Sequence, residues 1–454
     1  MEFYHDLTST RIFNHSITGQ SPCLTRYMSA WASTIDNLTW HKDILVIVAA
    51  GNLPSVPYPH KPVTRLSIRE HLSADRLYPD YLLENSCRIA NPAQSFQALT
   101  VGSIALNSYH VPPYSSIAQR DQPSAFSCSG FGIWNTIKPE VVEYGGDLVM
   151  DEGTPPNIIL HKDVAPELVR STLYGGPAIG CDKVGTSFAA PKVSHIAARL
   201  AAELPNESCL LYRALIVQSA RWPEWAMAED VNKLHVIRQI GYGIPNVDRA
   251  LGNSPNRVTL MTTGERRIVA KQAHVYQVKL PEKLRSPGEN FKILVEVTLS
   301  YKAQPRRTRR NRRKYLSTWL DWDCSKKGED TDKFLERILK EDDTPKDSEK
   351  GDKVFQWTLG KRSKNHGKID GVSRSAGTIQ KDWTIVNSFE LTDAFCIGVV
   401  GHEGWNNDPY ADVPYSLVVS FEAIQADIPI YTQIVEAQIE TEIQTETQIE
   451  MQSL

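Results

Sequence analysis

The sequence contains no apolar run long enough to cross a membrane. A transmembrane helix needs about 20 consecutive apolar residues, and no run of that length occurs among the 454 residues. The first residues are polar and acidic rather than an apolar core, so no secretory signal peptide is predicted. These absences predict that the protein has no membrane partner, and they favour a cytoplasmic location.

The chain also lacks an excess of charge of either sign. Its 50 Lys and Arg residues nearly balance its 53 Asp and Glu residues, which leaves a net charge of −3. Such a balance exerts no strong attraction on nucleic acid or on a membrane surface. The most basic stretch, residues 306–314, has no aromatic residues within it, and the acidic stretch 341–352 can offset it. A solvated loop is therefore favoured there over a nucleic-acid site.

Motifs for metals, cofactors and disulfide frameworks are missing. The number of cysteines is odd, their spacing is wide and no C-x-x-C pair occurs, which argues against both a zinc site and a disulfide framework. No D-x-D-x-D-G calcium loop is present either. We therefore predict no metal and no cofactor, and we expect reduced thiols at positions 23, 87, 128, 181, 209, 324 and 396.

The pattern of apolar residues divides the chain into two parts. Residues 1–252 mix buried-strand and helical patterns, whereas 255–425 contain runs in which every second residue is apolar, as in a β-sandwich. We expect a charged insertion at about 303–352 with one short helix, and a low-complexity tail at 426–454 that is disordered or a frayed helix. The alternating runs include Ile293, Val295, Val297, Leu299 and Tyr301, and then Tyr415, Leu417, Val419 and Phe421.

The most informative segment is Gly185-Thr186-Ser187-Phe188-Ala189-Ala190-Pro191, which leads into a helical pattern. A serine at a helix start has an outward-facing N–H that can hold an oxyanion while its hydroxyl attacks a carbonyl. Pro191 is predicted to lie in the first turn, where a missing N–H costs little. The alternative interpretation is that Ser187 only caps the helix.

A second segment, residues 44–52, is a continuous apolar run that ends in Gly51-Asn52. Such a run predicts a strand buried on both faces of a parallel sheet. Asn52 by itself could simply continue a turn after Gly51.

These two segments resemble the subtilases, the subtilisin-like serine peptidases. Further strings resemble the family in the expected order over about residues 11–251, and longer links than in small members occur at 53–88 and 147–180. The resemblance implies an α/β fold with a parallel sheet and flanking helices, and some subtilases also carry a C-terminal β-sandwich. It implies that Ser187 is the nucleophile, that Asn52 belongs to the oxyanion hole, and that the substrate groove includes Asn14, Ser16, Ile17 and Thr18.

The same resemblance exposes a gap. The family uses an Asp and then a His before the strand that resembles residues 11–19, but only ten residues precede that strand here. His5 and Asp6 lie in neither family motif, His15 lies within the groove strand, and His195 follows Ser187 by two helical turns. No histidine is therefore assigned as the base, and the chain is predicted to lack the first strands of the family's sheet.

Two functions remain open. The first is a subtilisin-type serine endopeptidase that hydrolyses protein or peptide substrates through an acyl-enzyme on Ser187, with a second chain supplying the missing Asp and His. A serine without its base is a weak nucleophile, so the activity of the chain alone is in doubt. The alternative is a non-catalytic protein that binds extended peptides in the groove.

Overall fold

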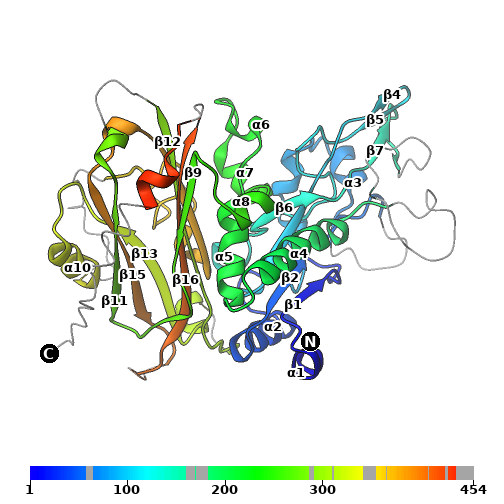
Figure 1. Cartoon of the computed structure of the whole chain (residues 1–454). Coiled ribbons are helices and arrows are strands. Elements are labelled where there is room, and N and C mark those ends of the chain that lie inside the picture. Colours follow the sequence, from blue (N-terminus) through cyan, green and yellow to red (C-terminus); the bar gives the residue numbers. More distant parts are fainter. Residues whose placement is uncertain are drawn as a thin grey trace.

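The computed structural model describes residues 1–57, 65–159, 169, 183–285, 291–308, 311–340, 354–364, 366–406, 408, 410–424 and 428–435. An α/β unit and a β-sandwich lie side by side (Figure 1). No helix in these ranges is long and apolar enough to span a bilayer.

A four-stranded parallel sheet forms the centre of the first unit. Its spatial order is β1 (Ile12–His15), β2 (Leu45–Ala49), β3 (Leu99–Ile104) and β6 (Val141–Tyr144). All three neighbouring pairs are parallel. The strand predicted at residues 44–52 is β2, and all five of its residues are buried. β1 is the outermost strand, and no described strand pairs with its other edge.

Helices cover both faces of this sheet. Along β2, Leu45, Ile47 and Ala49 belong to the core formed with α4 (Thr186–Glu203), whereas Val46 and Val48 belong to the core that includes Ile35. Ile35 lies on α2 (Ala30–His41), whose start is capped by Ser29. Alternate residues of one strand thus face opposite layers, which explains why the sequence of β2 is apolar throughout.

Shorter elements complete the first unit. A small antiparallel sheet of four short strands lies beyond the parallel sheet, and five further helices surround the core. The strands are β4 (His110–Val111), β5 (Tyr114–Ser116), β7 (Val149–Asp151) and β8 (Ile158–Ile159), and the helices are α1 (Glu2–Thr8), α3 (Ile68–Ser73), α6 (Glu224–Met227), α7 (Lys233–Ile240) and α8 (Val247–Leu251).

The second unit is a sandwich of two antiparallel sheets, as the alternating pattern predicts. In one sheet β9 (Arg257–Met261) and β10 (Arg266–Ile268) both pair with β16 (Val413–Ile424), which continues through β12 (Lys292–Tyr301) to β14 (Ile379–Asn387). The other sheet has the order β11 (Ala273–Lys279), β15 (Ala394–Glu403) and β13 (Thr318–Cys324).

The structure corrects two expectations about this unit. β13 lies within 303–352, so that stretch is not simply a charged insertion; it also contains α9 (Arg312–Tyr315) and α10 (Thr331–Lys340). The buried Asp321 of β13 is paired with Lys361 and His402, and these partners allow a charged residue inside a sheet.

The second correction concerns the tail, which was expected to begin at residue 426. Ile430 and Ile434 are fully buried in the sandwich core, so the packed region continues past that boundary. Residues 436–454, which make up most of the expected tail, lie outside the described part of the chain.

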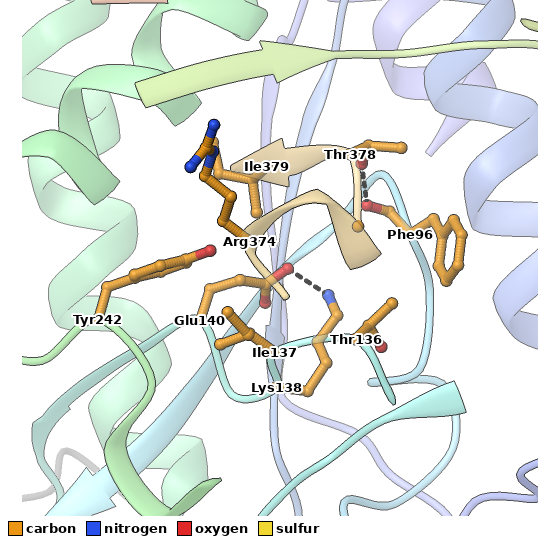
Figure 2. Close-up of a pocket in the computed structure, with 10 residues that line it drawn as sticks. Phe96, Thr136, Ile137, Lys138, Glu140, Tyr242, Arg374, Thr378 and Ile379 are labelled. Carbon is orange, nitrogen blue, oxygen red and sulfur yellow. Dashed lines mark hydrogen bonds and ion pairs between the residues drawn. The ribbon is translucent and has the colours of Figure 1, made fainter. Parts of the chain in front are cut away.

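The two units share a continuous interface. Helix α5 (Cys209–Ser219) packs on β12 and β16. Asp36 of the first unit is fully buried, and its carboxylate accepts hydrogen bonds from Ser95 Oγ, from two backbone amides and from Tyr315 Oη of the second unit. A cavity of about 10 Å³, close to the size needed for one water molecule, lies between Phe96, Glu140 and Arg374 (Figure 2).

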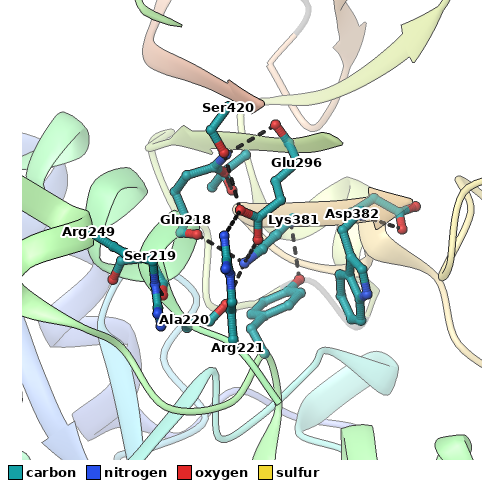
Figure 3. Close-up of polar contacts among 12 residues, drawn as sticks. Gln218, Ser219, Ala220, Arg221, Arg249, Glu296, Lys381, Asp382 and Ser420 are labelled. Atoms are coloured by element: carbon teal, nitrogen blue, oxygen red, sulfur yellow. Dashed lines mark hydrogen bonds and ion pairs between the residues drawn. The ribbon is translucent and has the colours of Figure 1, made fainter. Parts of the chain in front are cut away.

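Buried charges form the most polar part of this interface. Glu296 of β12 contacts Lys381 at 2.8 Å and Arg221 at 3.2 Å (Figure 3). Arg221 also contacts Glu422 at 2.6 Å. Burial alone would raise the pKa of Glu296, but the charges of Lys381 and then Arg221 lower it to about 2. Glu296 is therefore ionised in the folded protein at neutral pH.

Glu296 should be essential to the stability of this interface. Replacing Glu296 with Gln leaves Lys381 and Arg221 without their shared anion, and we expect the free energy of unfolding at pH 7 to fall by about 3–5 kcal/mol. Because the folded pKa lies below the unfolded value, the contribution of Glu296 is present above about pH 4.5 and is lost as the pH falls toward 2.

Denaturant unfolding measured from pH 7 down to the lowest pH at which the protein stays folded tests this expectation. The matched control is Glu265→Gln, which removes a half-exposed partner of Arg267 and should cost about 1 kcal/mol or less. Equal losses in the two variants would contradict the importance assigned to the buried cluster.

Candidate active site

Ser187 lies in the first turn of α4, at the edge of the sheet where the parallel strands end. Gly185 is the capping residue, so the interpretation of Ser187 as a simple helix cap is wrong. The amide of Ser187 has no helical residue four positions earlier to accept its hydrogen bond. Since α4 begins at Thr186, Pro191 lies in the second turn rather than in the first, as had been predicted.

Asn52 follows β2 and lies against the start of α4. Its Oδ1 atom accepts hydrogen bonds from the Thr186 amide at 2.9 Å and from Thr186 Oγ1 at 3.0 Å. An amide N–H can only donate, so this contact fixes Oδ1 toward the helix and leaves Nδ2 as the free end of the side chain. Asn52 is exposed, and its two Nδ2 protons can therefore donate to a ligand beside Ser187.

Two glycines permit this close approach of strand and helix. Gly51 has a φ of +103°, and a Cβ atom there would lie 2.6 Å from Ala90 Cβ. Gly185 has a φ of +152°, and a Cβ atom there would lie 3.4 Å from Asn52 Nδ2. A side chain at Gly51 would clash with Ala90, and the positive φ at Gly185 disfavours any residue other than glycine, which explains the glycine in each motif.

Of the predicted groove residues, Ser16 contacts Ser187 directly, and most of the four are not part of a strand. β1 ends at His15, so Ser16, Ile17 and Thr18 follow it as irregular backbone rather than continuing the strand through residue 19. Ser187 Oγ donates to the Ser16 carbonyl at 3.0 Å. Ile17, the residue after Ser16, is 70% exposed, so its apolar side chain lies in solvent.

Asn14 lies on the edge strand itself and is turned toward α4. Its amide nitrogen donates to Ser16 Oγ at 3.0 Å, and its oxygen accepts from Ser194 Oγ at 3.2 Å. Of the predicted groove residues, Asn14 and Ser16 are thus bonded to the helix that carries Ser187.

No histidine in the described part of the chain hydrogen-bonds to Ser187. His15 packs edge-to-face on Trp31 at a ring distance of 5.3 Å, in the layer opposite α4, and burial lowers its pKa. His195 is exposed on α4 and lines an open cleft of about 470 Å³ with Glu143 and Lys192. The serine and its neighbouring amides are therefore assembled without a general base from these ranges.

The loop after β6 supports the start of α4 from the other side. Gly185 N donates to the Gly145 carbonyl at 2.9 Å. Asp147 is fully buried two residues later and accepts from the amides of Ala118 and Ala125 at 2.7 and 2.8 Å. Burial outweighs these bonds and raises the pKa of Asp147 to about 7.

Within the described ranges no group of three or more His, Cys, Asp and Glu residues could hold a metal ion. Six cysteines are buried and free. Cys181 and most of the 147–180 link lie outside the described residues, as do residues 58–64 of the other long link.

The fold and the site define an α/β protein of the serine-peptidase class. Residues 7–243, more than half of the chain, match the peptidase S8 model described as the subtilase family. The chain therefore belongs to the subtilase family of serine proteases.

The sequence identities to individual relatives are low. The uncharacterized protein y4bN of Sinorhizobium fredii is 29% identical over 309 residues, which cover 62% of this chain and 64% of that protein. MycP1 from Mycobacterium smegmatis is 19% identical with a TM-score of 0.31, covering 55% of this chain and 52% of that one. The prenylagaramide maturation protease PagA is 17% identical with a TM-score of 0.32, covering 55% and 63%. The chain spans less than two thirds of the length of each.

Sequence analysis missed the roles of Thr186 and Ser194. Thr186 Oγ1 accepts from Gly51 N at 3.2 Å while it donates to Asn52, so it joins both motifs. Its place in the Gly-Thr-Ser string could have suggested this role. Ser194 offers no such signal, because its contact with Asn14 depends on how the helix packs on β1.

The buried carboxyl of Asp147 should make the stability of the folded protein depend on pH. Its folded pKa is raised to about 7, above the usual value of 3.8, so ionisation disfavours the folded state. Stability from this group is highest at low pH and falls as the pH rises from about 4 to 7. In Asp147→Asn this slope should disappear, and the free energy of unfolding should fall by about 1–3 kcal/mol because the amide NH₂ cannot accept a hydrogen bond.

Urea unfolding at several pH values between 4 and 8 measures both effects. The exposed Asp230 provides the control, and Asp230→Asn should leave the slope unchanged. An unchanged slope in Asp147→Asn would show that Asp147 is ionised throughout this range.

Proposed function

We propose that the protein is a serine endopeptidase in which Ser187 Oγ attacks the carbonyl carbon of a peptide bond. The observation that carries this proposal is the pairing of Asn52 with the first turn of α4. With Oδ1 bound to Thr186, the Nδ2 protons of Asn52 and the amide of Ser187 are two donors for one developing oxyanion. A serine that only capped a helix would need no such second donor.

In the proposed reaction the hydroxyl proton leaves as the Oγ–C bond forms, and a base must receive that proton. The resting hydroxyl donates instead to the Ser16 carbonyl. A carbonyl oxygen does not serve as this base, and in this proposal the proton passes to a base on a second polypeptide. Collapse of the tetrahedral intermediate then releases the amine, and water hydrolyses the acyl-enzyme.

We expect a fluorophosphonate probe to label Ser187 when the partner that supplies the base is present, because the serine without a base is a weak nucleophile. Labelling should be absent in Ser187→Ala, and its rate should fall by about 100- to 1,000-fold in Asn52→Ala, which removes one oxyanion donor. Intact-mass spectrometry with peptide mapping measures the rate and locates the adduct. A matched control is Asn37→Ala, another exposed asparagine, which lies on α2 across the sheet from α4. Labelling that survives in Ser187→Ala would contradict the assignment of the nucleophile.

The proposal includes a polypeptide partner that supplies an acid–base pair to the serine. β1 is the outermost described strand of a parallel sheet, and the edge that pairs with no other described strand offers backbone groups for one more. Exposed apolar side chains lie in the segments on either side of β1, including Phe3 at 69%, Leu7 at 67% and Ile17 at 70%. An unpaired strand edge presents N–H and C=O groups that can pair with another chain, so this edge fits an added strand.

The partner can be sought by translating the DNA upstream of Met1 in all three frames for a segment with a D-T/S-G strand and an H-G-T helix. When that segment is mixed with this chain, hydrolysis of a fluorogenic peptide should appear and should be absent with Ser187→Ala. Hydrolysis by the chain alone at the same rate would contradict the need for a partner.

The second candidate is a protein that binds peptides without cleaving them. The observation that favours it is the same Ser187–Ser16 hydrogen bond, which leaves the serine without a base. In that case Ser187→Ala should bind peptides as tightly as the unaltered chain, and no fluorophosphonate adduct should form.

A further inference from the structure

The carbonyl oxygen of Ser187 has lost its helical donor. In an α-helix this oxygen would accept from the N–H of the residue four positions later. That residue is Pro191, which has no N–H. The proline therefore leaves an unpaired acceptor on the residue that also carries the candidate nucleophile.

Ser16, which lies outside the helix, supplies a donor to this carbonyl. Its hydroxyl donates to the Ser187 carbonyl at 3.2 Å. In return, Ser187 Oγ donates to the Ser16 carbonyl at 3.0 Å. Each serine thus places its hydroxyl on the other's backbone, and the two bonds fix the end of β1 against the first turn of α4.

Asn14 sets the direction of the Ser16 hydroxyl. The Nδ2 group of Asn14 can only donate, and it lies 3.0 Å from Ser16 Oγ, so the proton of Ser16 is left for the Ser187 carbonyl. Ser194 Oγ lies 3.2 Å from Asn14 Oδ1 and 3.1 Å from the Ala190 carbonyl, so its proton is shared between them. These hydrogen bonds therefore connect two residues of α4, Ser187 and Ser194, through Ser16 and Asn14.

We propose that Ser16 is a positioning residue for Ser187 and that Pro191, by lacking an N–H, leaves the Ser187 carbonyl available to the Ser16 hydroxyl. The contact itself does not depend on the proposed function; only its effect on the reaction rests on Ser187 being the nucleophile. Without Ser16 Oγ, the first turn of α4 loses a bond that no residue of the helix can replace. The Ser187 hydroxyl then samples more orientations relative to Asn52.

A double-mutant cycle tests the contact. Amide hydrogen exchange of residues 188–190 should be about three- to tenfold faster in Ser16→Ala, the effect of one lost hydrogen bond. In Pro191→Ala the backbone amide gained at position 191 can donate to the Ser187 carbonyl, so adding Ser16→Ala there should change exchange by less than about twofold. Ser73→Ala, which removes a different serine hydroxyl bonded to a helical carbonyl, should leave these amides unchanged. Equal effects of Ser16→Ala in both backgrounds, or none in either, would overturn the proposal.

The rate of fluorophosphonate labelling in the presence of the partner that supplies the base tests the positioning role. Ser16→Ala should lower the rate at saturating probe by about three- to tenfold and leave the probe concentration for half-saturation unchanged, whereas Ser16→Thr, which keeps the hydroxyl, should restore the rate. A rate in Ser16→Ala equal to that of the unaltered chain would overturn the positioning role. If no protein is labelled at all, the proposed nucleophile fails, and the exchange cycle still decides whether the Ser16 contact exists.

Discussion

The packing of α4 across the parallel sheet is the constraint on which the rest of the structure depends. The helix contacts all four strands, and its first turn meets the ends of β1 and β2. Three carbonyl or amide oxygens hold that turn: Asn52 Oδ1, the Gly145 carbonyl and the Ser16 carbonyl. Because each comes from a segment following a different strand, the candidate site exists only when the whole sheet is formed.

The sandwich packs against the α/β unit, so the structure of the site also depends on the second half of the chain. α5, which follows α4, presents Gln218 to Thr298, to the Glu296 carbonyl and to Ser420 Oγ. Polar groups buried in this way are costly unless both partners are present. The α/β unit and the sandwich therefore stabilise each other, and removal of the sandwich would expose a polar face of α5 as well as an apolar one.

Much of this arrangement could be predicted from sequence, and the failures have physical causes. Ser187 and Asn52 were identified as candidates because each lies in a short, specific string, and the alternation in β12 and β16 indicated the sandwich. The start of α4 was uncertain because a Gly-Thr-Ser turn and a helical turn share one sequence, so Pro191 was placed in the wrong turn. β13 was not predicted because its two aspartates resemble solvated residues. Their cationic partners, Lys361 for Asp321 and Arg337 for Asp323, are distant in the sequence. Polar residues in β12, such as Thr298, resemble a solvated face until α5 is seen against them.

The most direct test of the central claim is a crystal structure of the chain with a peptide boronic acid. The account predicts a covalent bond between boron and Ser187 Oγ, with one boronate oxygen within hydrogen-bond distance of both Asn52 Nδ2 and the Ser187 amide. Boron bound to another side chain, or an adduct on Ser187 whose oxygen points away from Asn52, would contradict the assignment of nucleophile and oxyanion hole.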